Sequence, residues 1–176
     1  MLAAVLLAGV ACTSEPDREA SPNVAPSVTA STADPFAYCA QVGTIDAPDA
    51  RYAGPRVPLT IAEGVKRATG APADTPAEMF VRGTSWRCMD GKVYACTVGA
   101  NLPCGEKADT NRTPSTAVAA FCQTNADAEV IPAAVTGRAT VYQWRCTAGT
   151  PVVVRQVAEA DRQGFLASFW HELKPS

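Results

Sequence analysis

The segment TSWRCMDGKVYACTV, residues 84–98, decides most of what the sequence says about the fold. Its centre, Asp90-Gly91, is the two-residue turn most typical of a β-hairpin, because a type I′ turn needs positive φ at both positions. We therefore expect strands at Thr84–Met89 and Lys92–Val98. The residues around the turn are rich in β-branched and aromatic side chains, as strands usually are.

A second segment, TVYQWRCTAGTPVVV at residues 140–154, has a similar plan. Strands are expected at Gly137–Cys146 and Pro151–Ala158, on either side of an Ala-Gly turn. A last strand, Phe165–Leu173, follows a turn at 161–164. The sequence thus predicts one hairpin followed by a three-stranded meander.

The two hairpins share the tripeptide Trp-Arg-Cys, which stands shortly before the turn glycine in both. It occupies 86–88 in the first hairpin and 144–146 in the second. Alternation along a strand would bury Trp and Cys on one face and display Arg on the other. The echo indicates either a two-fold hairpin repeat or ordinary strand chemistry that coincides by chance.

Three helices are expected from a capping residue or turn followed by proline at the first position. They begin at Asp34-Pro35, at Pro58 and at Thr113-Pro114, and glycines at 43 and 70 close the first two. The predicted class is α+β: one antiparallel sheet of about five strands, with short helices on one face. Three disulfides are expected to complete it.

Seven cysteines are an odd number, and an unpaired thiol in an exported protein needs an explanation. Setting Cys12 aside leaves Cys39, Cys88, Cys96, Cys104, Cys122 and Cys146. Six cysteines make three disulfides, which persist only in oxidising compartments. Cys88 and Cys96 would face opposite sides of the sheet and should not pair. Of the 15 connectivities, we favour 39–122, 88–146 and 96–104.

Residues 1–11 are uninterrupted apolar and small residues, and Cys12 follows. The run is too short to span a bilayer but suits the apolar part of an export signal. A cysteine in this position resembles the lipobox of bacterial lipoproteins. That resemblance implies a diacylglycerol on the Cys12 thiol, cleavage before Cys12 and acylation, typically with palmitate. The alternative is an ordinary secretory signal with an incidental cysteine.

Residues 12–35 are predicted to be the lipidated cysteine and a disordered tether, because they offer too little apolar surface to fold. Segment 13–35 carries four acids and one arginine, whereas the predicted domain, residues 36–176, has 14 basic and 13 acidic residues. A nucleic-acid binder should be markedly basic. We expect no nucleic-acid partner, but a membrane contact through the lipid and an unknown envelope protein or ligand.

Few residues suggest catalysis. His171 is the only histidine, and we expect it to pack on its strand beside Phe169 and Leu173. Asp46 and Asp49 lie in one loop and could act as a glycosidase-type pair, although such acids more often cap and turn the chain. The cysteine spacings lack the clusters of a zinc site. We expect no enzyme activity, cofactor or metal.

The candidate binding surface consists of Arg87, Arg145 and Asn101. The two arginines would be displayed on the open face of the strands. Asn101 lies in the loop Gly99–Pro103, between Cys96 and Cys104. An exposed rigid loop of this kind inserting into a cleft would favour an inhibitor.

The stretches around Cys39, Trp86–Cys104 and Thr140–Cys146 resemble a family of small exported bacterial lipoproteins without an assigned activity. The resemblance covers about residues 36–173 and implies an envelope location and no chemistry. The leading hypothesis is a membrane-anchored envelope lipoprotein, facing the extracytoplasmic side, whose domain is a non-enzymatic module for an unknown envelope protein or ligand. The alternatives are an inhibitor of a secreted hydrolase such as lysozyme, and a small hydrolase using the loop carboxylates.

Overall fold

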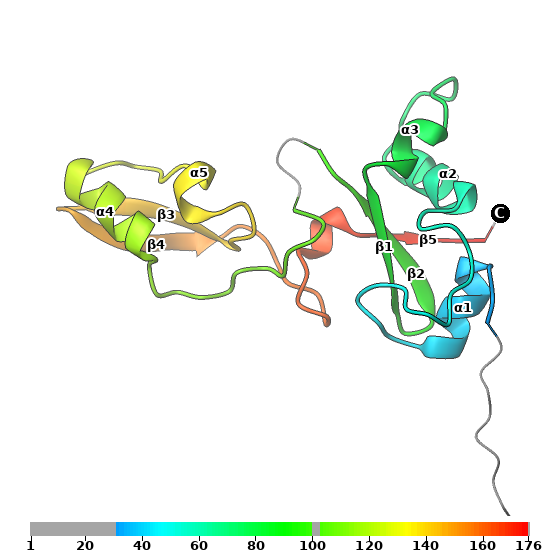
Figure 1. Ribbon diagram of the computed structural model, residues 1–176. Coiled ribbons are helices and arrows are strands. Elements are labelled where there is room, and N and C mark those ends of the chain that lie inside the picture. The colour runs from blue at the N-terminus through cyan, green and yellow to red at the C-terminus, as the bar shows by residue number, and fades with distance from the viewer. Residues whose placement is uncertain (1–30, 100–102, 176) are drawn as a thin grey trace, which may run out of the picture.

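The computed structural model describes residues 31–99 and 103–175 (Figure 1). Its helices are α1 (Pro35–Val42), α2 (Leu59–Ala68), α3 (Glu78–Val81), α4 (Thr116–Thr124) and α5 (Ala133–Thr136), with a 3₁₀ turn at Ala167–Phe169. Its strands are β1 (Thr84–Met89), β2 (Lys92–Thr97), β3 (Tyr142–Thr147), β4 (Thr150–Gln156) and β5 (His171–Leu173). None of the described helices is long and apolar enough to cross a membrane.

The α+β class, the five antiparallel strands and the three disulfides are confirmed. The strands, however, form two sheets, one with the order β1-β2-β5 and one made of β3 and β4. The expected three-stranded meander does not form, because β5 pairs with β2. After β4 the chain runs back to the first sheet before β5 begins (Figure 1).

Local capping explains where the helices begin. The Asp34 carboxylate accepts the backbone N–H of Phe36 at 2.8 Å, and Pro35 is the first helical residue, as predicted. α4 begins later than predicted. Ser115 is its cap and accepts the Val118 N–H at 3.3 Å, because a serine oxygen reaches the third N–H of the helix. The single-turn helices α3 and α5 were not predicted.

Both two-residue hairpin turns form as predicted, and both have the positive φ angles of type I′. The φ angles are +53° at Asp90 and +75° at Gly91, and +47° at Ala148 and +77° at Gly149. The register places Cys88 opposite Val93, as expected. The second hairpin differs by an irregularity in the pairing between Gln143 and Trp144, where β4 has one extra residue.

The elements gather into two lobes that lie end to end (Figure 1). The first lobe contains α1, α2, α3 and the β1-β2-β5 sheet, and the second contains α4, α5 and the β3–β4 hairpin. Each lobe has its own apolar core, built around Trp86 in the first and Trp144 in the second. The two lobes are connected by segments 104–115 and 157–170. These segments are joined by a hydrogen bond in which the Ala108 N–H donates to the Gly164 carbonyl at 2.7 Å.

One of the three predicted disulfide pairings is right. Cys96–Cys104 is present, but the predicted 39–122 and 88–146 pairs are replaced by Cys39–Cys88 and Cys122–Cys146. The prediction matched helix with helix and hairpin with hairpin. The structure instead ties each helix to the hairpin of its own lobe, since α1 and α4 lie in different lobes (Figure 1).

These two disulfides belong to a repeated unit. In the first repeat, residues 34–97, helix α1 is bonded through Cys39 to the Trp-Arg-Cys strand β1. In the second repeat, residues 115–157, α4 is bonded through Cys122 to β3 in the same way. An aromatic residue precedes each helical cysteine, and the tryptophan of each tripeptide is buried.

Backbone hydrogen bonds repeat as well. In each repeat, the chain just after the helix accepts three N–H groups from the hairpin: one from the first turn residue, one from the turn glycine and one from the strand cysteine. In the first repeat these are Asp90 to the Thr44 side chain, Gly91 to Gly43 and Cys88 to Ile45, at 2.8–3.0 Å. In the second they are Ala148 to the Asp127 side chain, Gly149 to Ala126 and Cys146 to Ala128, at 2.8–3.1 Å. These matches support a repeat over chance coincidence.

Candidate binding surface

Arg87 is not part of a surface, and that prediction is wrong. Its side chain is completely buried and pairs with the carboxylate of Asp161 and the side chain of Gln163. Its guanidinium carbon lies 4.6 Å from the ring centroid of Phe165 and 4.3 Å from that of Trp170. An acidic and aromatic segment therefore covers this arginine.

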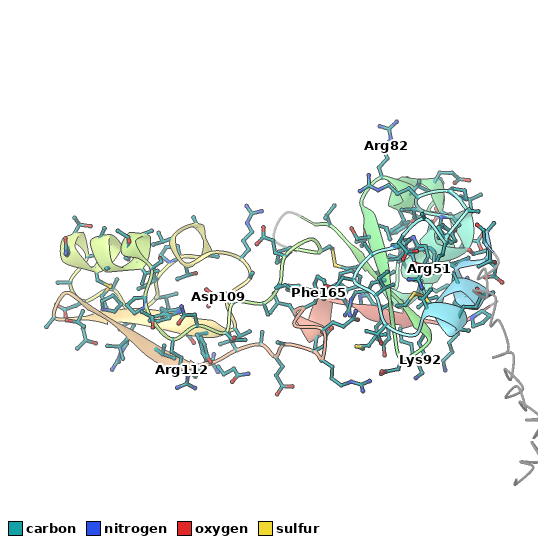
Figure 2. All side chains as sticks on the ribbon, turned by 60° about the horizontal axis from the view of Figure 1, so that its bottom comes forward. Arg51, Arg82, Lys92, Asp109, Arg112 and Phe165 are labelled. Carbon is teal, nitrogen blue, oxygen red and sulfur yellow. A yellow bond between two sulfur atoms is a disulfide. The ribbon has the colours of Figure 1, made fainter. Side chains whose placement is uncertain are left out.

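The covering segment is residues 161–170, which connect the second lobe to β5. Its residues Phe165 and Trp170 lie on the face of β1 and β2 that carries Arg87, whereas Leu166 is buried in the core of the second lobe. A small core forms on that face of β1 and β2 from Cys96, Cys104, Phe165 and Trp170. Figure 2 shows Phe165 at the junction of the two lobes. Arg87 does point away from Trp86 and Cys88, as strand alternation requires, but solvent does not reach it.

Arg145 is exposed, as predicted. It lies directly opposite Val152 on the hairpin face that points away from Trp144 and Cys146. Gln143 and Arg155 are paired on the same face, where the Arg155 Nε donates to the Gln143 side-chain oxygen at 2.9 Å. We call the surface formed by Gln143, Arg145, Val152, Val154 and Arg155 the Arg145 face.

The Arg145 face is cationic and partly apolar. Neither β3 nor β4 contains an acidic residue, and within the described chain no carboxylate forms an ion pair with its two arginines. Val152 is 37% exposed and Val154 46%. The two helices of this lobe lie on the other side of the hairpin (Figure 1). The two valines therefore form a small apolar patch beside the two arginines.

The edge of β4 is less suited to contact than its face. In the first lobe, β5 pairs with the equivalent edge of β2. No described strand pairs with the outer edge of β4. Pro151 removes one backbone donor there, and the extra residue in β4 interrupts the ladder. Proline and bulges are the usual protection of an edge against strand addition.

The two loop carboxylates do not share a site. Asp49 accepts a bidentate ion pair from Arg51, with the shorter contact at 2.6 Å, and the Tyr38 hydroxyl lies 3.1 Å away. The Arg51 guanidinium holds the pKa of Asp49 well below its usual range. Asp46 instead contacts the Lys107 ammonium at 2.5 Å and the Gln163 amide at 2.9 Å.

Asp49 borders a recess of about 310 Å³ in the first lobe. Its other walls include Trp86, Thr84 and Arg56. The Thr84 hydroxyl is buried and has no hydrogen-bond partner among the described residues. Asp46 does not line this recess. The recess therefore contains one strongly ionised carboxylate, that of Asp49, rather than an acid–base pair.

The remaining predicted residues give no further site. His171 is half-buried in β5 opposite Ala95. Leu173, on the same side of the strand, is buried in the first-lobe core, whereas Phe169 belongs to the 3₁₀ turn before the strand. Cys12 and Asn101 lie outside the described residues. No group of three or more potential metal ligands occurs in segments 31–99 and 103–175.

The sequence does not predict that segment 161–170 covers Arg87. Its acid and aromatics were assigned to a turn and a strand, and nothing local showed that they would cover Arg87. The run of three valines at 152–154 is a clearer sign of an exposed apolar surface. Successive side chains of a strand point to opposite faces, so at least one valine of the run must lie on the open face.

Comparison with protein families, with curated proteins and with solved structures finds no match to this chain.

Proposed function

We propose that this chain is a lipid-anchored protein of the bacterial cell envelope, and that its extracytoplasmic domain is a non-enzymatic binding module. The Arg145 face is its contact surface for a protein partner. The observation that carries the proposal is the difference between two equivalent arginines. One is covered by a segment of the chain, and the other is open beside exposed valines.

The pairing of the cysteines supports an extracytoplasmic location. All six cysteines after Cys12 are paired in disulfides. Disulfides at this density are typical of exported proteins. With these six accounted for, Cys12 is left as the thiol available for lipid.

A binding role is favoured over hydrolysis by the state of the carboxylates. A hydrolase of the glycosidase type needs a protonated acid and a second carboxylate a short distance away. Asp49 is strongly ionised by Arg51, and Asp46 is engaged by Lys107 outside the same recess. The pair therefore lacks the arrangement that this chemistry requires.

Photo-cross-linking in living cells tests the surface. A benzoylphenylalanine placed at Val154 should yield a discrete cross-linked product, and Arg145→Glu in the same chain should remove it. The matched control carries the probe at Met79, which is 71% exposed in the first lobe. Equal products from both positions, or none from position 154, would contradict the proposal.

Fractionation tests the anchor. Cys12→Ala should move the protein from the membrane fraction to the soluble fraction, because a single thiol holds the lipid. The folded domain should be unchanged, as judged by its three disulfides in non-reducing mass analysis. A wild-type chain that is already soluble and carries no lipid would refute the anchor.

A further inference from the structure

We propose that the partner presents to the Arg145 face a polypeptide segment in which a carboxylate is followed by aromatic side chains, as in this chain's own segment 161–170. The inference rests on the proposed function, which assigns this face to a protein partner without saying how the partner is recognised. Its evidence is the contact that the first repeat already makes in the equivalent place.

The first repeat shows what this arginine position binds. The Asp161 carboxylate and the Gln163 amide oxygen accept from the two terminal nitrogens of Arg87. The aromatic rings at 165 and 170 pack against the guanidinium plane. An arginine thus satisfied by a carboxylate and by ring faces combines charge-assisted hydrogen bonds with cation–π contacts.

The covering segment is organised so that acid and ring lie on one side. Asp161 caps its own turn, because its carboxylate accepts the N–H groups of Gln163 and Phe165 at 2.9 and 3.1 Å. The Asp161 N–H donates to the Phe165 carbonyl at 2.8 Å, and Gly164 has a φ of +81°. Such a turn needs only a short piece of chain, so another protein can supply one in a loop.

The second repeat has an arginine at the equivalent strand position, with Arg155 where the first repeat has Cys96. Arg145 follows Trp144 and precedes Cys146, as Arg87 follows Trp86 and precedes Cys88. The residue opposite the arginine is Val152 in one hairpin and Tyr94 in the other. Both offer an apolar side chain beside the guanidinium. Arg155 adds a second positive charge to the Arg145 face, which strengthens the preference for an acidic partner.

The occupant must come from another kind of chain. This chain's segment 161–170 is already engaged with Arg87. A second copy docked face to face through a two-fold axis would bring Arg145 and Arg155 against the same two arginines, and an isologous contact of like charges is unfavourable. An acidic, aromatic segment of a different protein satisfies both the charge and the exposed valines.

A peptide probe tests the proposal. A fluorescent peptide with the sequence of residues 158–171, AEADRQGFLASFWH, is titrated with the full chain and followed by fluorescence anisotropy. We expect binding that weakens at least about tenfold in Arg145→Ala, since a charged hydrogen bond is lost. Arg82→Ala is the matched control, because Arg82 is exposed and points away from the molecule in Figure 2; its affinity should stay within about twofold.

Two altered peptides separate acid from ring. A peptide with lysine in place of Asp161 should bind at least about tenfold more weakly. A peptide with alanine in place of both Phe165 and Trp170 should show a similar loss. No binding of the parent peptide, equal binding by the lysine peptide, or equal binding to Arg145→Ala would overturn the inference. So would self-association of the chain that Arg145→Ala abolishes. A cross-link at Val154 without peptide binding would leave the binding surface standing and remove only the acid–aromatic specificity.

Discussion

The two repeats share a scaffold and differ in what covers it. In both, a helical cysteine is bonded to a Trp-Arg-Cys strand, and the chain after the helix accepts matching N–H groups from the hairpin. The first repeat has its outer face closed by residues 161–170, whereas the outer face of the second is open. Local sequence therefore builds the scaffold, and a distant segment decides whether the arginine of an identical tripeptide is buried or exposed.

Replacing the two arginines should give the largest contrast. Arg87→Ala leaves the Asp161 carboxylate, which is 10% exposed, without its cation. Losing one partner of a buried pair costs about 3–5 kcal/mol. Arg145→Ala removes an exposed side chain and should change the free energy of unfolding by no more than about 0.5 kcal/mol. Urea denaturation measures both.

A double variant separates charge from packing. Arg87→Met with Asp161→Asn should recover part of the loss, since no buried charge is then left unpaired and the asparagine oxygen can still accept the turn N–H groups. If Arg87→Ala and Arg145→Ala lowered the free energy of unfolding by equally small amounts, the covering of Arg87 would not contribute to stability.

The equivalent disulfides should have similar effects, each in its own lobe. Cys39–Cys88 spans 49 residues and Cys122–Cys146 spans 24. The chain-entropy model assigns them roughly 4 and 3.5 kcal/mol. Changing either pair to alanine should lower stability by about that amount, and amide hydrogen exchange should show the loss chiefly in the hairpin concerned. A loss spread evenly over both hairpins would show that the lobes unfold as one.

A turn substitution should stabilise only the second repeat. Ala148 has a φ of +47°, which strains an alanine, whereas asparagine tolerates this region. Ala148→Asn should raise the free energy of unfolding by about 0.5–1 kcal/mol. Thr147→Asn, one residue earlier in the strand, is the control and should give no gain. Thermal unfolding of both variants, followed by a probe in the second hairpin, measures the two changes in stability.

Acid should weaken the first lobe selectively. The Arg51 ion pair lowers the pKa of Asp49, and the Lys92 contact lowers that of Glu172. A carboxylate with a lowered pKa in the folded state stabilises the fold above its unfolded pKa of about 4 and loses that contribution as the pH falls below it. Stability of the first lobe should therefore decline below about pH 4. In Asp49→Asn that decline should be shallower; an unchanged slope would exclude this cause.

Much of the local structure was predictable. The Asp90-Gly91 turn fixed the register of the first hairpin, and Pro35 after Asp34 marked the start of α1. Parity along β1 and β2 separated Cys88 from Cys96, and the short loop between Cys96 and Cys104 favoured the pairing of these two cysteines. Each of these depends on residues close in sequence, whose physical constraints are complete within a few positions.

The remaining features depend on contacts between distant residues. Arg87 and Arg145 stand in the same tripeptide, yet Arg87 is covered by a residue 74 positions away. The pairing of β5 with β2 rather than β4 is likewise non-local. The Arg145 face could be located from the sequence only as a displayed arginine. Its valines and its open state required knowing where segment 161–170 goes.

The path of the chain also sets the order in which the lobes can be finished. A polypeptide made from its N-terminus presents α1, β1 and β2 first, but residues 161–173, which cover Arg87 and supply β5, follow only after the second hairpin. The second lobe has all of its helices and strands once its own hairpin has appeared, and it then needs only Leu166 to complete its buried core. A chain cut short before residue 161 would leave Arg87 of the first lobe exposed to water and the outer edge of β2 unpaired. The second lobe would lose only the buried side chain of Leu166 and the packing of Phe169. The lobe that begins first is thus the last to close.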